Sequence, residues 1–204
     1  EYPGVLLTRP VFQTKMGVNP LNIIKKEEKA MILGIVGSPR KGQLTDQLVT
    51  RTLEGAGSTG AQTEKVYLVD FEVPFYTEEA SCAEQLSRLC EKADALVIGT
   101  PVYYGDLNGL TKDFMDTVRI SNANGKYGLG ISVAGGTGKG LCLAVQSIYS
   151  FFYHRQMRGI DPTPVSRFNF EKVRETLYHS GQKLAKVCRK NEPFENLWDR
   201  IEHY

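Results

Sequence analysis

The sequence predicts an α/β protein in which an open parallel sheet of five strands carries helices on both faces. Two observations favour this fold class. Short apolar runs alternate with longer segments whose apolar residues recur at helical spacing, from residue 31 to residue 190. The runs are also almost continuously apolar, as in strands that are buried on both faces. Such alternation builds βαβ units, whose right-handed crossovers give a three-layer sandwich.

Each element is identified by its apolar pattern and by the residues that end it. The first run is closed by Gly37-Ser38-Pro39, and the helix after it ends where Gly57 and Gly60 follow. The expected strands are 31–36, 63–69, 95–99, 127–133 and 164–168. The expected helices are 44–56, 83–93, 107–118, 141–157 and 171–188.

Composition limits the class of protein. The chain has 204 residues, of which 41% are apolar and 24% charged, with a formal net charge of +2. This predicts one large globular domain, or less readily two small ones, and excludes a mainly disordered chain. We divide it into an extended arm (1–30), a folded domain (31–190) and a tail (191–204). The arm is either a frayed terminus or a segment that lies across a neighbouring subunit.

Other features narrow the setting of the protein. No apolar run is long enough to span a membrane, and the first 15 residues do not resemble a signal peptide, so we expect a cytoplasmic protein without a membrane partner. No segment is basic enough to predict nucleic-acid binding. The four cysteines are scattered and have no spacing typical of a metal site, which predicts reduced, mostly buried thiols and no bound metal.

Ligands of open parallel sheets bind beyond the carboxyl ends of the strands, which directs attention to the loops after strands one, three and four. The first loop combines Ser38, Arg40 and Thr45 with the start of a helix, where unpaired N–H groups and the helix dipole favour an anion. The spacing predicts a phosphate site. The alternative is a capped turn with a solvated Arg-Lys pair. Neither a Walker loop nor a G-x-G-x-x-G pattern is present after the first strand, which disfavours ATP hydrolysis and primary NAD binding.

The other two loops favour a planar ligand. Two adjacent tyrosines after strand three could wall a flat aromatic ring or could simply pack against the chain. The glycines after strand four would let a ring approach backbone N–H groups, unless they only form a flexible turn. The residues in question are Pro101, Val102, Tyr103, Tyr104 and Gly105, then Gly135, Gly136, Thr137 and Gly138. A phosphorylated planar cofactor is predicted, and flavin mononucleotide (FMN) fits best.

Residues 31–45, 95–105 and 109–116 resemble the flavodoxin-like NADPH-dependent FMN reductases, and more closely their iron–sulfur flavoprotein branch. The resemblance rests on a G-S-P-R-x-G-x-x-T opening together with a P-V-Y-[YF]-G loop. It implies the strand order 2-1-3-4-5, NADPH or NADH as electron donor, and a homodimer or homotetramer. It also implies that the phosphate of FMN is held by Ser38, Arg40, Thr45 and the backbone of Gln43 and Leu44. By the same resemblance, residues 101–105 flank the flavin ring and residues 135–138 line its pyrimidine side.

The chain departs from the iron–sulfur branch in its cysteines. That branch has a tight cysteine cluster between the second strand and the second helix, whereas residues 71–90 hold only Cys82 and Cys90. Four cysteine ligands cannot be assembled locally, so we predict that the protein has no iron–sulfur centre.

The function expected from these observations is an FMN-dependent oxidoreductase that passes electrons from NAD(P)H to a small acceptor such as a flavin or a quinone. Since the flavin performs the chemistry, no side chain is assigned as general acid or base. Tyr103, Tyr104 and Asp106 are the residues expected to contact the second substrate. Two alternatives stay open: an electron carrier of the flavodoxin type without NAD(P)H turnover, and a non-redox nucleotide-binding protein that kept only the fold.

Overall fold

A computed structural model describes residues 29–77 and 83–190 of the chain. The strands are β1 (Met31–Val36), β2 (Gln62–Tyr67), β3 (Ala95–Tyr103), β4 (Asp106–Leu107), β5 (Tyr127–Ala134), β6 (Arg158–Gly159) and β7 (Thr163–Ser166). The helices are α1 (Leu44–Ser58), α2 (Glu84–Lys92), α3 (Gly109–Thr117), α4 (Leu141–His154) and α5 (Phe170–Lys190), with a 3₁₀ turn at Leu68–Asp70. The predicted arm, apart from residues 29 and 30, and the predicted tail lie outside these ranges.

The sheet confirms the predicted parallel α/β architecture. Its order is β2-β1-β3-β5-β6, and β7 also pairs with β5. All of these pairings are parallel, while β4 adds a short antiparallel hairpin to the end of β3. The described part of the sheet therefore has seven strands, and the prediction of five was too low.

Besides β4, one additional strand arises at the fifth position of the sheet. The fifth position of the sheet is shared, because β6 lies beside the start of β5 and β7 beside its end. Asp161, which has a left-handed backbone (φ 47°), and Pro162 interrupt the pairing between them. The expected strand 164–168 instead ends at Ser166, whose backbone N–H donates to the side chain of Asn169 just before α5.

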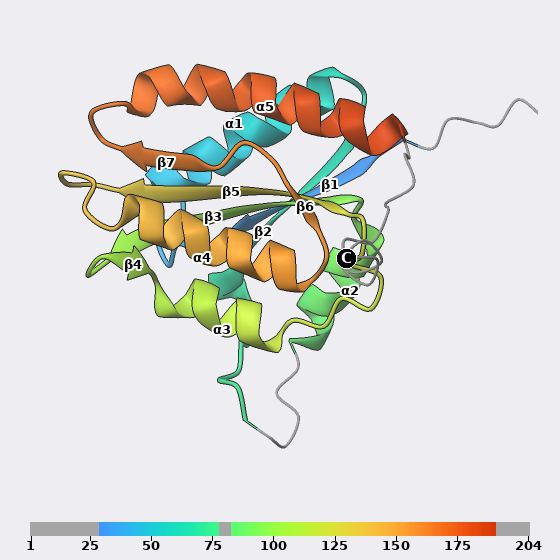
Figure 1. Cartoon of the computed structure of the whole chain (residues 1–204), viewed down its shortest axis with the longest axis horizontal. Helices are drawn as coiled ribbons and strands as arrows, with labels where there is room; N and C mark the ends of the chain where they lie inside the picture. Colours follow the sequence, from blue (N-terminus) through green and yellow to red (C-terminus); the bar gives the residue numbers. More distant parts are fainter. Residues whose placement is uncertain (1–28, 78–82, 191–204) are drawn as a thin grey trace, which may run out of the picture.

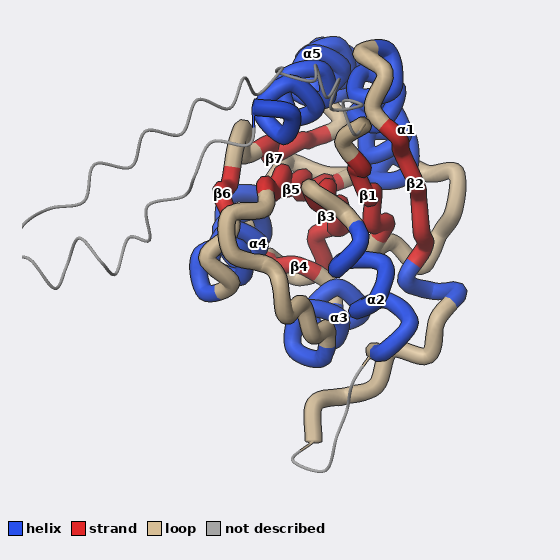
Figure 2. The backbone as a smooth tube through the Cα atoms, turned by 90° about the vertical axis from the view of Figure 1, so that its right-hand side faces the viewer, coloured by secondary structure: helices blue, strands red, loops and turns tan. Residues whose placement is uncertain are grey.

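Helices cover both faces of the sheet, as Figures 1 and 2 show: α1 and α5 lie on one face and α2, α3 and α4 on the other. Successive residues of β1 point to opposite layers. Leu33 and Ile35 belong to the apolar cluster under α2–α4, whereas Ile32 and Val36 belong to the cluster under α1 and α5. This double burial is why the strand reads as a continuous apolar run.

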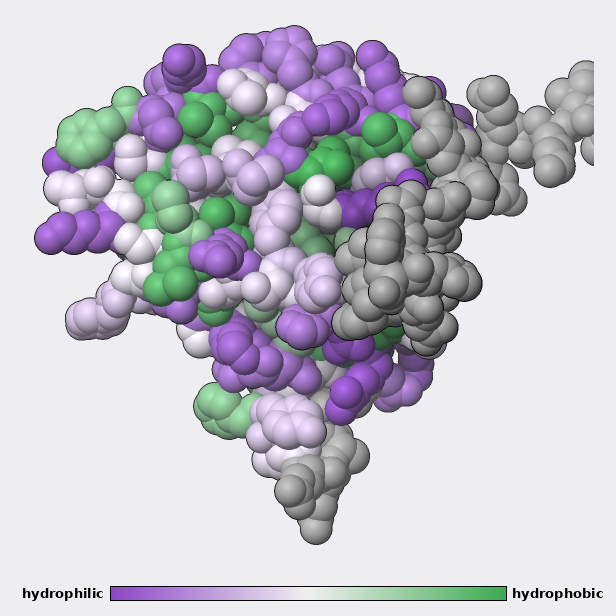
Figure 3. Space-filling model, in the orientation of Figure 1, coloured by the Kyte–Doolittle hydropathy of each residue, from purple (hydrophilic) through white to green (hydrophobic). Residues whose placement is uncertain are grey.

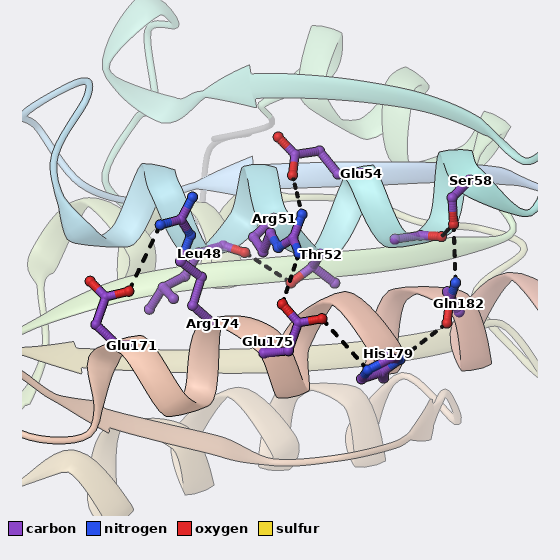
Figure 4. A network of polar contacts seen from close by, with 11 residues as sticks. Leu48, Arg51, Thr52, Glu54, Ser58, Glu171, Arg174, Glu175, His179 and Gln182 are labelled. Atoms are coloured by element: carbon purple, nitrogen blue, oxygen red, sulfur yellow. Dashed lines mark hydrogen bonds and ion pairs between the residues drawn. The ribbon is translucent and has the colours of Figure 1, made fainter.

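Helices α1 and α5 pack unusually closely because each supplies a glycine where they meet. A Cβ atom on Gly55 would lie 1.9 Å from the carbonyl oxygen of Tyr178, and one on Gly181 would lie 1.9 Å from that of Thr52. Ion pairs flank this contact, including that between Arg51 and Glu175 at 2.9 Å (Figure 4). The contact fixes the position of α1, whose first turn faces the candidate site.

None of the helices in the described ranges is both long and apolar enough to cross a bilayer. Hydrophilic side chains cover much of the face shown in Figure 3, with apolar areas between them. Leu143 and Tyr153 of α4 are each 53% exposed, and Phe168 in the loop before α5 is 71% exposed.

Candidate functional site

Three loops meet at the carboxyl ends of the central strands. The backbone N–H of Gly37 after β1 donates to the carbonyl of Gly99 in β3 at 2.8 Å. Between β5 and α4, a Cβ atom on Gly140 would lie 2.0 Å from the carbonyl oxygen of Gly105 in the β3–β4 turn. The backbones of neighbouring loops are thus in direct contact, and the predicted phosphate, aromatic and glycine segments lie at one edge of the sheet.

The β1–α1 loop leaves the start of α1 without a side-chain cap. Gly42 has a left-handed backbone (φ 74°), and Gln43, the N-cap residue, makes no capping hydrogen bond. Thr45 is 3% exposed, and its hydroxyl has no hydrogen-bond partner among the described residues. Arg40 is exposed and has no ion-pair partner in the same ranges. Uncapped N–H groups, a hydroxyl and a guanidinium suit a phosphate group.

The Ser38 hydroxyl forms hydrogen bonds within its own turn, whereas the sequence predicted a contact with the phosphate. The Ser38 side chain is buried, and its hydroxyl accepts a hydrogen bond from the backbone N–H of Arg40 and donates one to the carbonyl of the same residue, both at 3.1 Å. In this arrangement the hydroxyl shapes the turn that presents Arg40. A direct contact between Ser38 and phosphate stays a prediction.

The predicted aromatic loop is in large part a strand. β3 continues to Tyr103, so Pro101, Val102 and Tyr103 are strand residues, and the expected end at Gly99 was wrong. The extension is held by antiparallel pairing with β4, in which Val102 faces Leu107 and Tyr103 faces Asp106.

A tight turn at Tyr104 and Gly105 closes this hairpin, with both residues left-handed (φ 51° and 96°). Its tip presents aromatic surface to solvent: Tyr104 is fully exposed and Tyr103 is 39% exposed. A tyrosine in the left-handed region is unusual, because only glycine adopts it without steric cost.

The β5–α4 loop divides into an open half and a packed half. Cβ atoms placed on Gly135 and Gly136 would meet no atom within 4 Å, and Thr137 beside them is exposed. Gly138 and Gly140 instead have left-handed backbones (φ 88° and 83°) and lie against neighbouring residues. The open half leaves room for a ligand, while the packed half fixes the loop.

Asn108 links the first two loops and was missed in the sequence analysis. Its side-chain amide donates to the carbonyl of Gly37 at 2.8 Å, and its carbonyl accepts from the hydroxyls of Thr100 (3.1 Å) and Thr111 (2.6 Å). It also caps α3 by accepting from the backbone N–H of Thr111. The helix expected over 107–118 begins at Gly109 instead, so Asn108 precedes it as the N-cap residue, a position at which asparagine is strongly preferred.

These features define the class of protein: a parallel α/β protein with a site for a phosphorylated planar cofactor. The chain belongs to the NADPH-dependent FMN reductase family, whose model matches residues 30–166. Its cofactor is FMN, and the donor set at the start of α1 and the open glycines of the β5–α4 loop fit a phosphate and a flat ring.

The chain is similar to several proteins named iron–sulfur flavoproteins. One from Methanocaldococcus jannaschii is 26% identical over 187 residues, which cover 78% of this chain and 97% of that protein. Another, from Archaeoglobus fulgidus, is also 26% identical, over 85% of this chain and 95% of its own length.

Solved structures confirm the flavodoxin-like fold. A flavodoxin from the domain Archaea superposes with a TM-score of 0.60 at 17% identity, covering 78% of this chain and 99% of that one. The apo form of an NADH:FMN oxidoreductase gives a TM-score of 0.60 at 18% identity, covering 82% and 92%. At these identities the likeness concerns the fold alone.

The cysteines of the described ranges do not gather. Cys90 of α2 is completely buried in the core, and burial raises the pKa of its thiol to about 12. Cys142 is exposed and Cys188 half-buried, and no group of three or more potential metal ligands is found among the described residues. Cys82 lies outside them. The absence of an iron–sulfur centre therefore stays a prediction.

Proposed function

We propose that this FMN-dependent oxidoreductase takes its electrons from NADPH or NADH and passes them to a small acceptor such as a flavin or a quinone. The observation that carries the proposal is the meeting of an uncapped helix start, an exposed aromatic hairpin and an open glycine segment at one sheet edge. Family membership supports the nicotinamide donor.

The phosphate of FMN would lie at the start of α1. Arg40 and the Thr45 hydroxyl would contact it together with the backbone N–H groups of Gln43 and Leu44, while Ser38 holds the turn. The flavin ring would then extend along the sheet edge, between the hairpin 101–105 and the loop 135–138. The open space at Gly135 and Gly136 supports this direction.

When bound, FMN supplies the redox chemistry, accepting a hydride equivalent from the reduced nicotinamide and giving two electrons to the acceptor. The chain positions the partners. Tyr103 and Tyr104 present aromatic surface on which a nicotinamide or a planar acceptor would stack. Asp106 is half-buried and accepts the backbone N–H of Leu107 at 2.7 Å, so we assign the substrate contact chiefly to the two tyrosines.

Anaerobic absorption spectroscopy tests this function. The protein is loaded with FMN and mixed with NADPH or NADH, and the flavin absorbance is followed before an acceptor is added. We expect rapid bleaching with at least one nucleotide and recovery when a flavin or quinone is supplied. A slow or absent bleach in a protein that binds FMN would favour the electron carrier. Failure to bind FMN would favour the non-redox protein that kept only the fold.

We also propose a homodimer or homotetramer. The proposal rests on the resemblance to the FMN reductases, in which such oligomers are usual, and the exposed apolar side chains Leu143, Tyr153 and Phe168 are candidates for the contact. Light scattering during size-exclusion chromatography tests this, and a mass of one chain would contradict it.

A further inference from the structure

A nearly buried carboxylate lies directly behind the loop that we assign to the FMN phosphate. The Asp46 side chain is 7% exposed. Its Oδ2 accepts the backbone N–H of Gly42 at 2.7 Å and the hydroxyl of Tyr67 at 3.0 Å, while its Oδ1 accepts Lys65 Nζ at 2.8 Å and the hydroxyl of Thr50 at 3.2 Å. The carboxylate therefore connects the loop with strand β2.

The bond to Gly42 determines how the chain enters α1. Gly42 is left-handed, and the extended residue Gln43 directly precedes the helix. By holding the N–H of Gly42 from the first turn of α1, Asp46 closes a short ring of residues 42–46. This ring fixes the backbone at Gln43 and Leu44, whose N–H groups we assign to the phosphate.

The positive charges around the loop are paired unequally. Lys65 pairs with Asp46, and Lys41 pairs with Asp70 at 2.6 Å. Both ammonium groups also lie near the Tyr67 ring, at 4.8 Å for Lys41 and 5.1 Å for Lys65 from its centroid. Within the described ranges, Arg40 is thus the cation of this loop that has no ion-pair partner and is available to a ligand.

Asp46 would by itself hinder phosphate binding. A carboxylate in the first turn of α1 repels a phosphate dianion, and at short range in a partly buried site this repulsion is considerable. Lys65 offsets it, since its Nζ lies 2.8 Å from the carboxylate. Burial alone would raise the pKa of Asp46, but hydrogen bonds from Lys65, Gly42 and Tyr67 outweigh it and hold that pKa below its ordinary value.

We propose that Asp46 is a positioning residue for the FMN phosphate, holding the turn at Gly42 while Lys65 cancels its charge. The proposal rests on the proposed function, in which the phosphate lies at the start of α1. It predicts a role in selecting FMN over riboflavin, because the two ligands share the ring and differ in the phosphate.

The test compares FMN and riboflavin binding by quenching of flavin fluorescence. For Asp46→Ala we expect FMN affinity to fall about tenfold or more, the effect of losing a charge-assisted hydrogen bond, while riboflavin affinity changes little. Asp46→Asn, which keeps the shape and an acceptor for Gly42, should lose less and serves if the alanine variant does not fold. Glu54→Ala is the matched control, because it removes a carboxylate from the exposed side of the same helix.

A charge cycle tests the second half of the proposal. Lys65→Met leaves the carboxylate without its cation and should weaken FMN binding most at low salt, where repulsion is least screened. Adding Asp46→Asn to Lys65→Met removes that charge and should restore much of the affinity. Failure of the double variant to recover affinity would overturn the charge-cancelling role of Lys65.

The outcomes separate the two proposals. If wild type prefers FMN to riboflavin and both Asp46 variants keep the full preference, the role of Asp46 is refuted while the phosphate site stands. Equal weakening of both ligands would show a merely structural role and would also refute it. If wild type itself binds riboflavin as well as FMN, the phosphate site at α1 fails, and the inference fails with it.

Discussion

The close contact between α1 and α5 predicts that Gly181→Ala destabilises the protein. The added Cβ atom would lie 1.9 Å from the carbonyl oxygen of Thr52 and 3.0 Å from the backbone nitrogen of Ala56. The first distance is roughly 1.5 Å short of a van der Waals contact. Because both partners are backbone atoms, no side-chain rotation relieves the overlap, and the helices must move apart.

The magnitude follows from two opposing effects. Alanine in place of a helical glycine gains about 0.5–1 kcal/mol, whereas overpacking a close contact costs typically 1–3 kcal/mol and occasionally more. With a backbone collision we take the upper end and expect a net loss of about 2 kcal/mol. For a protein of this size that lowers Tm by about 4–8 °C.

Thermal and urea unfolding followed by circular dichroism measures the effect, with Gly57→Ala as the control. Gly57 lies in α1, the helix against which Gly181 of α5 packs, and a Cβ atom there would meet nothing within 4 Å. Its alanine variant should therefore gain about 0.5–1 kcal/mol. If Gly181→Ala were as stable as wild type while Gly57→Ala gained stability, the steric reasoning at the helix contact would be refuted.

Three further predictions concern the candidate site. Arg40→Ala combined with Thr45→Ala should weaken FMN binding by about 2–3 kcal/mol, since a charge-assisted contact and a hydroxyl are lost; unchanged affinity in a fluorescence titration would contradict our phosphate assignment. Asn108→Ala should lower the free energy of unfolding by about 2–4 kcal/mol, because the Gly37 carbonyl and two buried threonine hydroxyls lose this hydrogen-bond partner. A loss below about 0.5 kcal/mol in urea unfolding would argue against the linking role of Asn108. The pKa of Asp46 is lowered on folding, so its ionised carboxylate stabilises the fold fully above about pH 4 and loses this contribution as the pH falls through the lowered pKa. In an acid titration, the difference in free energy of unfolding between wild type and Asp46→Asn should therefore shrink. A difference that stays constant would contradict this direction.

The sequence was sufficient for elements that bury a continuous apolar face. Strand β1 has its predicted bounds, because the double-sided burial of Ile32 to Val36 leaves a strong local pattern. Helix α1 begins at the predicted Leu44. Strands β4 and β6 have two residues each and carry no periodicity of their own. They exist because a neighbouring strand offers unpaired backbone groups, which is a tertiary effect.

The same distinction applies to the site. Its three loops could be found from residue types and their place after strands, since parallel strands bring their carboxyl ends together. The partners of Asp46 could not, because Lys65 and Tyr67 come from β2, about 20 residues away along the chain, and their contact depends on how α1 packs beside that strand. A side chain whose role is set by such a contact leaves little trace in the local sequence.

The glycines of the site are of two kinds, those that the fold requires and those that leave room for a ligand, and this difference yields a last prediction. Gly140 is required by the fold, since a Cβ atom there would collide with the backbone of Gly105, whereas Gly136 faces open space and has no left-handed backbone. Gly136→Ala should therefore leave stability within about 0.5 kcal/mol of wild type but weaken FMN binding, because the new methyl group occupies room that we assign to the flavin ring. Gly140→Ala should lower Tm even without flavin. Equal FMN affinity in wild type and Gly136→Ala would place the ring elsewhere along the sheet edge, because a side chain added to the open half of this loop must change the affinity of a ligand that contacts it.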